Sequence, residues 1–257
     1  MNIYQHFRPE EKEFIDHARG WVEAVKQNYC PRLTDFLNPR EQQILLALVG
    51  NDDAALLQFF GGSEAVERKR ALIYPDYYVP EKADYQLILF EISYPKKFIS
   101  LEHRHVLGTL MSLGLKREKF GDILIDGQNV QFIAAAEIED YLTANLEKMG
   151  NVSVSIKKLS LTEIIIIKEH WEEQSHTVSS LRLDVLLAAV TNLSRQKAQT
   201  LLAAGKVKVN FKSTEHGSME CREGDTLSVR GFGRAKILSI DGKTKKEKWR
   251  ISIGRHK

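Results

Sequence analysis

Residues 181–210, LRLDVLLAAVTNLSRQKAQTLLAAGKVKVN, carry the clearest structural pattern in the C-terminal part of the chain. Leucines and a valine at 181–187 lie on one face of a short helix. Ser194 is a typical N-cap for a second helix over 195–204, and Gly205 suits the position after its last turn. Residues 206–210 then alternate between lysine and valine, which indicates a strand with one buried face.

The residues that follow predict further strands of the same module. Gly224-Asp225 indicates a turn, and residues 226–230 read as a strand. Residues 235–240 and 248–253 predict a terminal hairpin, with Asp241-Gly242 between them. The lysines near its tip either reach a polyanion or keep an exposed sheet edge from aggregating.

Charge is distributed unevenly along the chain. The 257 residues have a formal net charge of +3, with 43% hydrophobic and 28% charged residues, which is ordinary globular usage and argues against disorder, collagen or a disulfide scaffold. Residues 181–257 hold 17 Lys and Arg against 7 Asp and Glu, whereas residues 1–180 hold 20 against 27. A net charge of +10 on the C-terminal part and −7 on the rest indicates a polyanionic partner for residues 181–257.

Positions of different chemistry in this part agree, in order, with one known pattern. They are Arg182-Leu-Asp184, Ser194-Arg195, Ala198, Leu201-Leu202, Gly205, Val207, Val209-Asn210, Gly224-Asp225 and Val229-Arg230-Gly231. The pattern resembles the alpha-L RNA-binding fold of small-subunit ribosomal protein S-four, over residues 181 to about 240. The resemblance implies a basic surface, formed by two helices and the following loop, that grips structured RNA. The residues at matching positions are Arg182, Arg195, Gln196, Lys197, Lys206, Lys208, Asn210 and Lys212.

Elementary electrostatics points to the same surface. Lysine and arginine neutralise phosphates and release counterions, and a helix N-terminus capped by Ser194 presents backbone N–H groups to an anion. Arg230 and Arg234 add cations at a strand end, where Arg234 replaces the aromatic residue of an RNA-recognition signature that Arg230-Gly-Phe-Gly233 begins. The alternative for any single cation is that it only solvates the surface.

Arg182-Leu-Asp184 also resembles the catalytic motif of pseudouridine synthases. In those enzymes the aspartate is followed by a Thr-Ser-Gly stretch, whereas Val185-Leu-Leu continues a helix here. We therefore expect Asp184 to organise the fold, either by pairing with a nearby basic side chain or by capping a helix.

Residues 1–75 are predicted to form a mostly helical region. Apolar residues recur at spacings of three and four over 14–25, and Asn38-Pro39 with Glu41 is a typical capping box. Ser63 is a candidate cap for a third helix through Glu67-Arg68-Lys69-Arg70, whose charges favour a solvated helix face over a site.

The spacing of the apolar residues changes over residues 76–165, where it indicates strands as well as helices. Strands are expected at 85–94, 122–125, 130–134 and 152–156, with helices at 103–112 and 136–149. The order β-α-β-β-α-β is that of the ferredoxin-like split motif, many members of which bind RNA on an open sheet face. Phe90 and Phe132 are candidate stacking residues there, although core packing is favoured.

Three segments outside the C-terminal module resemble the YlmH-type proteins of Gram-positive bacteria and cyanobacteria. They are residues 103–124, residues 32–41, and Gly61-Gly62 followed by Glu67-Arg68-Lys69-Arg70. One departure is His105, at a position where we expect Asp. In the first segment Arg104, Lys116 and Arg117 are candidates for a second RNA contact, the alternative being that residues 116–119 form a solvated loop.

This resemblance implies a non-enzymatic protein that docks on rRNA, that of the large ribosomal subunit, in ribosome-associated quality control or translation rescue. It implies a cytoplasmic, ribosome-associated location, with tRNA as a further candidate partner. No cofactor, small-molecule substrate or membrane contact is expected. Family genes lie beside cell-division genes, so a cell-division adaptor remains an alternative.

Motifs of known catalytic chemistry are missing from the sequence. It contains neither a phosphate-binding loop nor a Gly-x-Ser-x-Gly motif, and His103 and His105 point apart on a helix, so no metal site is expected. Cys30 and Cys221 match no metal or redox spacing, which favours two reduced thiols although one disulfide stays open. We predict no enzyme, with an RNA-modifying enzyme as the alternative.

The sequence thus predicts an α+β chain with no targeting or membrane-spanning segment. Its expected parts are a helical N-terminal region (1–75), a ferredoxin-like βαββαβ central domain that is also a candidate RNA-binding domain (76–165), a linker (166–180) and an S-four-like RNA-binding domain with a terminal hairpin (181–257).

Overall fold

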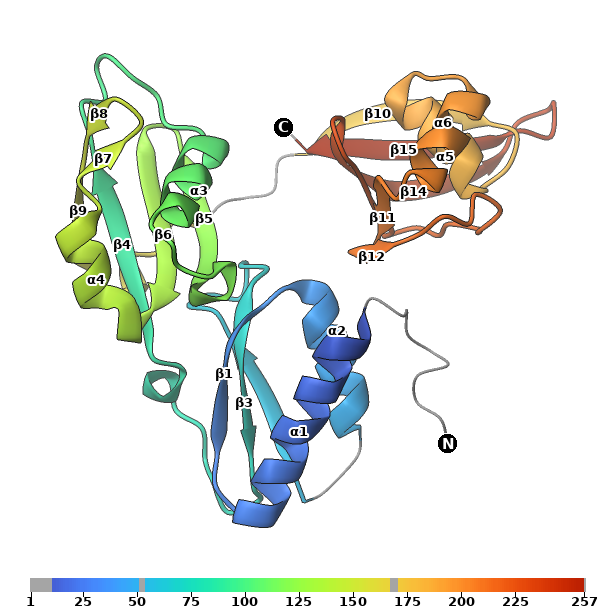
Figure 1. Cartoon of the computed structure of the whole chain (residues 1–257). Helices are drawn as coiled ribbons and strands as arrows, with labels where there is room; N and C mark the ends of the chain where they lie inside the picture. Colours follow the sequence, from blue (N-terminus) through green and yellow to red (C-terminus); the bar gives the residue numbers. More distant parts are fainter. Residues whose placement is uncertain (1–10, 51–53, 167–170, 257) are drawn as a thin grey trace. The chain divides into compact units, whose positions relative to one another are not determined.

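The chain consists of two compact units, Met1–Ile167 and Lys168–Lys257, each built from helices and strands (Figure 1). This computed structural model describes residues 11–50, 54–166 and 171–256, without the side chain of residue 256. The predicted α+β class is confirmed. No helix in the described ranges is long and apolar enough to cross a membrane.

The N-terminal part of the first unit is a small sheet covered by two helices, and the prediction of a mostly helical region is wrong. Helix α1 (Lys12–Asn28) is followed by strand β1 (Arg32–Leu37), helix α2 (Pro39–Val49) and strands β2 (Leu56–Phe60) and β3 (Lys69–Tyr74). The antiparallel strand order is β1-β3-β2. The predicted helix through residues 67–70 is the entry to β3. The charged residues suggest a solvated helix, but residues 69 and 70 begin this strand, and residues 71–73 that follow are all buried.

Helix α2 begins as predicted. The Asn38 side chain accepts hydrogen bonds from the backbone N–H groups of Arg40 and Glu41, at 2.9 and 3.0 Å. Glu41 in turn accepts from the Asn38 backbone N–H at 2.7 Å, which completes the capping box. A short 3-10 helix, η3 (Lys82–Tyr85), leads to the next sheet.

The central part has the predicted ferredoxin-like order. It runs β4 (Leu87–Ser93), α3 (His103–Ser112), η4 (Arg117–Lys119), β5 (Phe120–Asp126), β6 (Asn129–Ala135), η5 (Ala136–Ile138), α4 (Glu139–Asn145), β7 (Lys148–Met149), β8 (Val152–Ser153), β9 (Ser155–Leu159) and η6 (Leu161–Glu163). The antiparallel strand order is β5-β6-β4-β9.

Helix α4 is shorter than the predicted 136–149. The chain leaves it at Leu146 and turns through the β7–β8 hairpin, where Gly150 has a φ of +60°. Leu146 and Met149 are both buried, and their spacing of three imitates a helix that continues.

Both faces of the central sheet are covered. On one face Phe90 and Phe132 stack at 5.3 Å between ring centroids and are buried with residues of α3 and α4, so the favoured assignment to the core is confirmed. On the other face Leu89, Leu124 and Ile133 pack with Phe36 of β1, Val66 and the segment from Leu161 to Ile165. The open face on which related domains stack RNA bases is therefore closed here.

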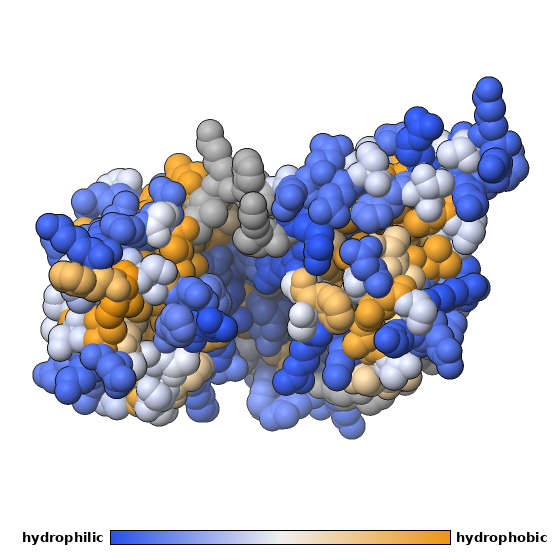
Figure 2. All heavy atoms as spheres, turned by 90° about the horizontal axis from the view of Figure 1, so that it is seen from above, coloured by the Kyte–Doolittle hydropathy of each residue, from blue (hydrophilic) through white to orange (hydrophobic). Residues whose placement is uncertain are grey.

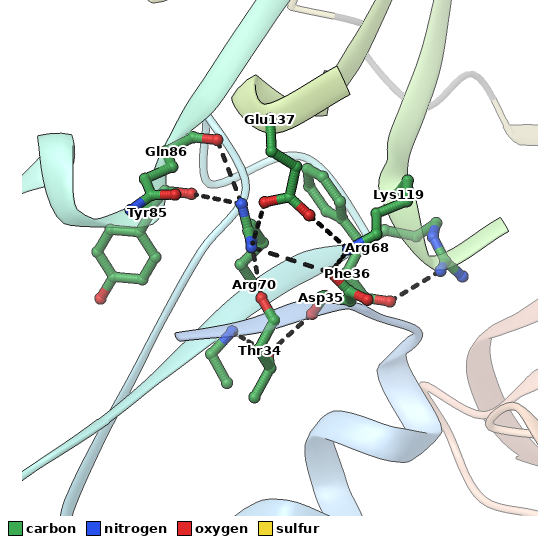
Figure 3. A network of polar contacts seen from close by, with 10 residues as sticks. Thr34, Asp35, Phe36, Arg68, Arg70, Tyr85, Gln86, Lys119 and Glu137 are labelled. Carbon is green, nitrogen blue, oxygen red and sulfur yellow. Dashed lines mark hydrogen bonds and ion pairs between the residues drawn. The ribbon is translucent and has the colours of Figure 1, made fainter. Parts of the chain in front are cut away.

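A polar network ties the N-terminal sheet to the central part (Figure 3). Arg70 of β3 is 3% exposed and donates to the backbone oxygens of Thr34 at 2.7 Å and of Tyr85 and Gln86 at 3.3 Å. Its guanidinium also lies 3.6 Å from the Glu137 carboxylate. Lys119 pairs with both Asp35 and Glu137. These contacts fix the two parts as one unit.

The second unit is a six-stranded antiparallel sheet with two helices on one face. It contains β10 (Trp171–Val178), α5 (Leu183–Thr191), α6 (Arg195–Ala203), β11 (Val207–Val209), β12 (Lys212–Ser213), β13 (Thr226–Val229), β14 (Gly233–Lys243) and β15 (Trp249–His256). The strand order is β10-β15-β14-β13-β11-β12. Leucines of α5 and α6 pack against valines and isoleucines of β11, β13, β14 and β15.

Residues 171–178, predicted as part of a linker, form β10 and pair with β15 from Trp171↔His256 to Val178↔Trp249. This strand is mostly polar because it is an edge strand, so no apolar alternation marks it in the sequence. The predicted helices, the strand after Gly205 and the terminal hairpin are all present. Cys30 and Cys221 are free thiols, so no disulfide joins them.

Candidate nucleic-acid interface

Asp184 is the centre of the predicted basic surface. Its carboxylate is fully buried and accepts hydrogen bonds from Arg182 at 3.1 and 3.2 Å and from Arg195 at 2.9 and 2.7 Å. Gln199 donates a further bond at 3.3 Å. Burial alone would raise the pKa of Asp184, but these bonds outweigh it and lower that pKa to about 2. The prediction that Asp184 organises the fold is confirmed.

This carboxylate therefore sets the positions of two predicted RNA-binding arginines. Arg182, the N-cap residue of α5, and Arg195, the first residue of α6, are brought together although they lie on different helices. Their side chains remain 40% and 54% exposed, so part of each guanidinium faces outward. Gln199 belongs to the same cluster and was missed by the sequence analysis, although its spacing of four from Arg195 places it on the same helix face.

The first turn of α6 presents two cations. Arg195, Gln196 and Lys197 are all exposed, and the Ser194 hydroxyl accepts from the Lys197 backbone N–H at 3.3 Å. Cations are unfavourable at a helix N-terminus, because the helix dipole is positive there. Placing Arg195 and Lys197 at this end, with no acidic residue in the turn, creates a site that favours an external anion.

A second group of predicted residues lies at the other end of α6 and on the sheet. The backbone N–H of Arg230 donates to the Lys206 oxygen at 2.9 Å, which places these exposed cations side by side. Lys208 pairs with Ser228, and Ser228 with Arg234, so all three residues share one sheet face. Arg234 lies over the Phe211 ring at 5.6 Å, and neighbouring Lys212 is half-buried.

Asn210 has a structural role. Its side-chain amide donates to Asp225 at 2.7 Å, and its side-chain oxygen accepts from the Thr226 backbone N–H at 2.8 Å. Its φ of +48° is one that asparagine tolerates better than most residues. Both ends of the amide are thus engaged within the fold, which explains the asparagine without RNA.

The three central candidates are not equivalent. Arg104 is exposed and paired with Glu102 at 2.8 Å, and Lys116 is exposed. Arg117 instead donates to the backbone oxygens of Phe120 at 2.6 Å and of Gly121 at 3.1 Å. Burial and the nearby Arg68 cation lower the pKa of Arg117 to about 10, so it remains charged but faces inward. The structure assigns Arg117 to the fold.

Two family-pattern features also prove to be local structure. His105 accepts a hydrogen bond from the Glu102 backbone N–H at 3.3 Å, so the imidazole fills the capping position at which we expect Asp. Arg68 donates to the Phe36 and Phe120 oxygens, and its backbone N–H and that of Glu67 donate to Asp122. The segment 67–70 is thus a half-buried connection rather than a solvated face.

Metal chemistry finds no support in the part of the chain that the structure describes. Within it, no three His, Cys, Asp or Glu side chains are grouped so that they could hold an ion. What the second unit offers instead is a set of fixed and exposed cations on helices and strands.

Comparisons with known proteins agree with this geometry. A family described as "Putative RNA-binding domain in YlmH" matches residues 80–163, and one described as "S4 domain" matches residues 181–227. The curated "Ribosome-associated protein quality control protein P2" of Bacillus subtilis (strain 168) is 48% identical over 256 residues, covering 100% of this chain and 99% of that protein. The solved structure "Cell division protein ylmH from Streptococcus pneumoniae" is similar with a TM-score of 0.55 and 36% identity, covering 64% of this chain and 100% of that chain.

Proposed function

Because the chain belongs to the YlmH family of RNA-binding proteins with an S-four domain, we propose that it docks on structured rRNA of the large ribosomal subunit. It acts there in ribosome-associated quality control, as the name of its Bacillus subtilis relative states for that protein. Its location is accordingly the cytoplasm, at the ribosome, where a tRNA is a further candidate partner.

One observation carries this proposal. The first turn of α6 holds Arg195 and Lys197 where the helix dipole disfavours cations, and the buried Asp184 fixes the direction of Arg195. A locally unfavourable arrangement that the fold maintains is expected at a functional site. Phosphate is the anion that fits, since duplex RNA is recognised mainly through its backbone and shape.

We propose that the protein has no catalytic activity of its own. A pseudouridine synthase requires an aspartate that reaches a uridine. Asp184 is fully buried and bonded to two arginines and a glutamine, so its carboxylate is occupied by the fold. The appearance of a modified base in rRNA only when the protein is present would contradict this.

The test is sedimentation of the full chain with separated ribosomal subunits at several salt concentrations. The informative variant is Lys197→Ala with Lys208→Ala, because neither ammonium group has a hydrogen bond or ion pair within the described residues. We expect weaker binding to the large subunit, and a slope of log affinity against log salt that is smaller by about 1.5.

The matched control is Lys12→Ala with Lys157→Ala, which removes the same charge from exposed positions of the first unit. Its affinity and salt slope should stay near those of the unmodified protein. Binding that does not depend on salt, equal binding to the small subunit, or a Lys197/Lys208 variant that matches the control would refute the proposal.

A further inference from the structure

The central part of the first unit cannot bind RNA on an open sheet face, as many ferredoxin-like domains do. Phe90 and Phe132 stack within the core on one sheet face, and Phe36 and Val66 cover the other. An RNA contact of this part therefore has to use a loop or an edge. Such a contact needs an exposed aromatic side chain among cations outside the sheet.

The loop of residues 94–101, between β4 and α3, carries such a feature (Figure 1). Phe98 is 85% exposed, the largest exposed fraction of any large hydrophobic side chain among the described residues. Phe98 is not an isolated case, because the neighbouring Ile99 is exposed as well, so the loop presents a small apolar patch.

The first half of the loop is fixed by bonds of its own and by bonds to the β5–β6 turn. The Phe98 backbone N–H donates to Pro95 at 3.0 Å, and that of Lys96 to Tyr94 at 2.8 Å. The Tyr94 hydroxyl donates to the Gln128 oxygen at 3.0 Å, and the Lys96 ammonium to the Asn129 side chain at 2.8 Å. The β5–β6 turn thus holds the loop, which presents Phe98 outward. Binding of a ligand therefore costs little further conformational freedom of the loop.

Beside the loop lies an open hollow of about 420 Å³, between α3 and the β7–β8 hairpin. It is lined mainly by apolar groups, together with Arg104 and His105; the apolar members include Ile99, Leu101, Met149 and Val152. Figure 2 looks down on this end of the unit and shows hydrophobic residues reaching the surface among hydrophilic ones.

Gly108 leaves the wall of this hollow without a side chain. It lies inside α3, where glycine costs about 0.5–1 kcal/mol relative to alanine. A Cβ at this position would meet no atom within 4 Å, so internal packing does not require glycine. Gly20 of α1 is equally open, so the weight rests on the place of Gly108 in the lining of the hollow.

The charges around the site favour RNA over a protein partner. The segment of residues 94–105 holds three cations, Lys96, Lys97 and Arg104, against one carboxylate, Glu102, which is paired with Arg104 in the lining of the hollow. The ammonium group of Lys97 is exposed and has no partner within the described residues. An aromatic ring among cations is the arrangement with which proteins stack unpaired bases and contact their phosphates.

We propose that Phe98 stacks on an unpaired base of the bound RNA and that the hollow at Gly108 receives the adjoining nucleotide. This inference rests on the proposed function and adds to it a contact of a different kind. The second unit grips structured RNA through phosphates, whereas the loop at Phe98 reads a single-stranded segment.

The test measures binding of the full chain to a single-stranded 12-nucleotide uridine RNA by fluorescence anisotropy. Stacking on an aromatic side chain is worth enough that Phe98→Ala should weaken the affinity about 5- to 150-fold. Phe98→Trp should restore it, and the emission added by that tryptophan should be quenched when RNA binds.

A second variant separates binding from folding. Gly108→Leu fills the hollow and replaces glycine by a strong helix former, so we expect weaker RNA binding without a lower melting temperature. Val79→Ala is the control, since Val79 is an apolar side chain that is 81% exposed elsewhere on the unit. It should leave the RNA affinity unchanged.

Three results would overturn the inference. One is an unmodified protein that does not bind the uridine RNA, and another is a Phe98→Ala variant that binds it equally well. The third is a variant that retains RNA affinity but loses sedimentation with ribosomal subunits, which would mean that Phe98 contacts protein. The salt-dependent sedimentation described above is scored separately, so the proposed function can stand if this inference fails.

Discussion

Replacing Asp184 by asparagine removes the charge that holds Arg182 and Arg195 together. The carboxyl has a pKa of about 2 in the folded chain, against an ordinary value of 3.8. That difference corresponds to about 2 kcal/mol at pH 7, and solvent screening of two half-exposed arginines reduces it to about 1–2 kcal/mol. We expect Asp184→Asn to destabilise the second unit by that amount.

The same reasoning fixes the dependence on pH. A carboxyl with a lowered pKa stabilises the fold fully above its unfolded-state value, and this stabilisation falls as the pH drops toward the folded-state value. The difference between the unmodified protein and Asp184→Asn should therefore be constant from pH 7 to about 5. It should shrink steadily between about pH 4.5 and pH 2.

Urea unfolding followed by tryptophan fluorescence measures this difference, because Trp171 and Trp249 lie in the second unit. Glu172→Gln is the matched control, as it removes one exposed negative charge from the same unit. If charge alone mattered, both variants would bind RNA more tightly. We expect only Asp184→Asn to bind more weakly, since it releases Arg195. Two results would contradict this role of Asp184. One is an Asp184→Asn variant as stable as the control at pH 7, and the other is a difference in free energy of unfolding that does not change with pH.

Two further predictions concern the first unit. Arg70→Met removes the guanidinium that donates to three backbone oxygens and pairs with Glu137, and should lower the free energy of unfolding by about 3 kcal/mol in urea titrations; unchanged stability would show that the network does not join the two parts. Gly121→Ala places a Cβ at 2.8 Å from Phe36 and 3.1 Å from Ile133, and should cost about 1–3 kcal/mol, whereas Gly108→Ala should not lower the melting temperature. Equal melting temperatures for these two alanine variants would contradict the packing described.

Elements with strong local signals were predictable from the sequence. Helix α3 has the predicted bounds, and the caps at Asn38 and Ser194 form as their residue types require. The buried role of Asp184 was also predictable, because a helix that continues past it leaves no room for a catalytic loop. For the helix and the caps, the decisive interaction lies within a few residues along the chain, whereas Asp184 is also bonded to Arg195, eleven residues further on.

Apart from the end of α4, where a local spacing imitates a helix, the errors share a physical cause, since the missing information lies in distant partners. Strand β3 contains a buried cation, Arg70, whose acceptors are supplied by β1, by η3 and by the start of β4. Strand β10 is polar, and only its pairing with β15 identifies it. Asn210 and Arg117 resemble RNA-binding residues in sequence, but their hydrogen bonds stay within the fold.

The pairing of β10 with β15 brings the two described ends of the second unit together, at Trp171 and His256. A unit closed in this way can be cut and rejoined. If residue 256 were joined to residue 171 by a short connection, new termini could be opened in the exposed turn at residues 245–246 while every strand kept its partner. The second unit therefore has a topology that allows circular permutation, or insertion of the unit into a surface loop of another protein.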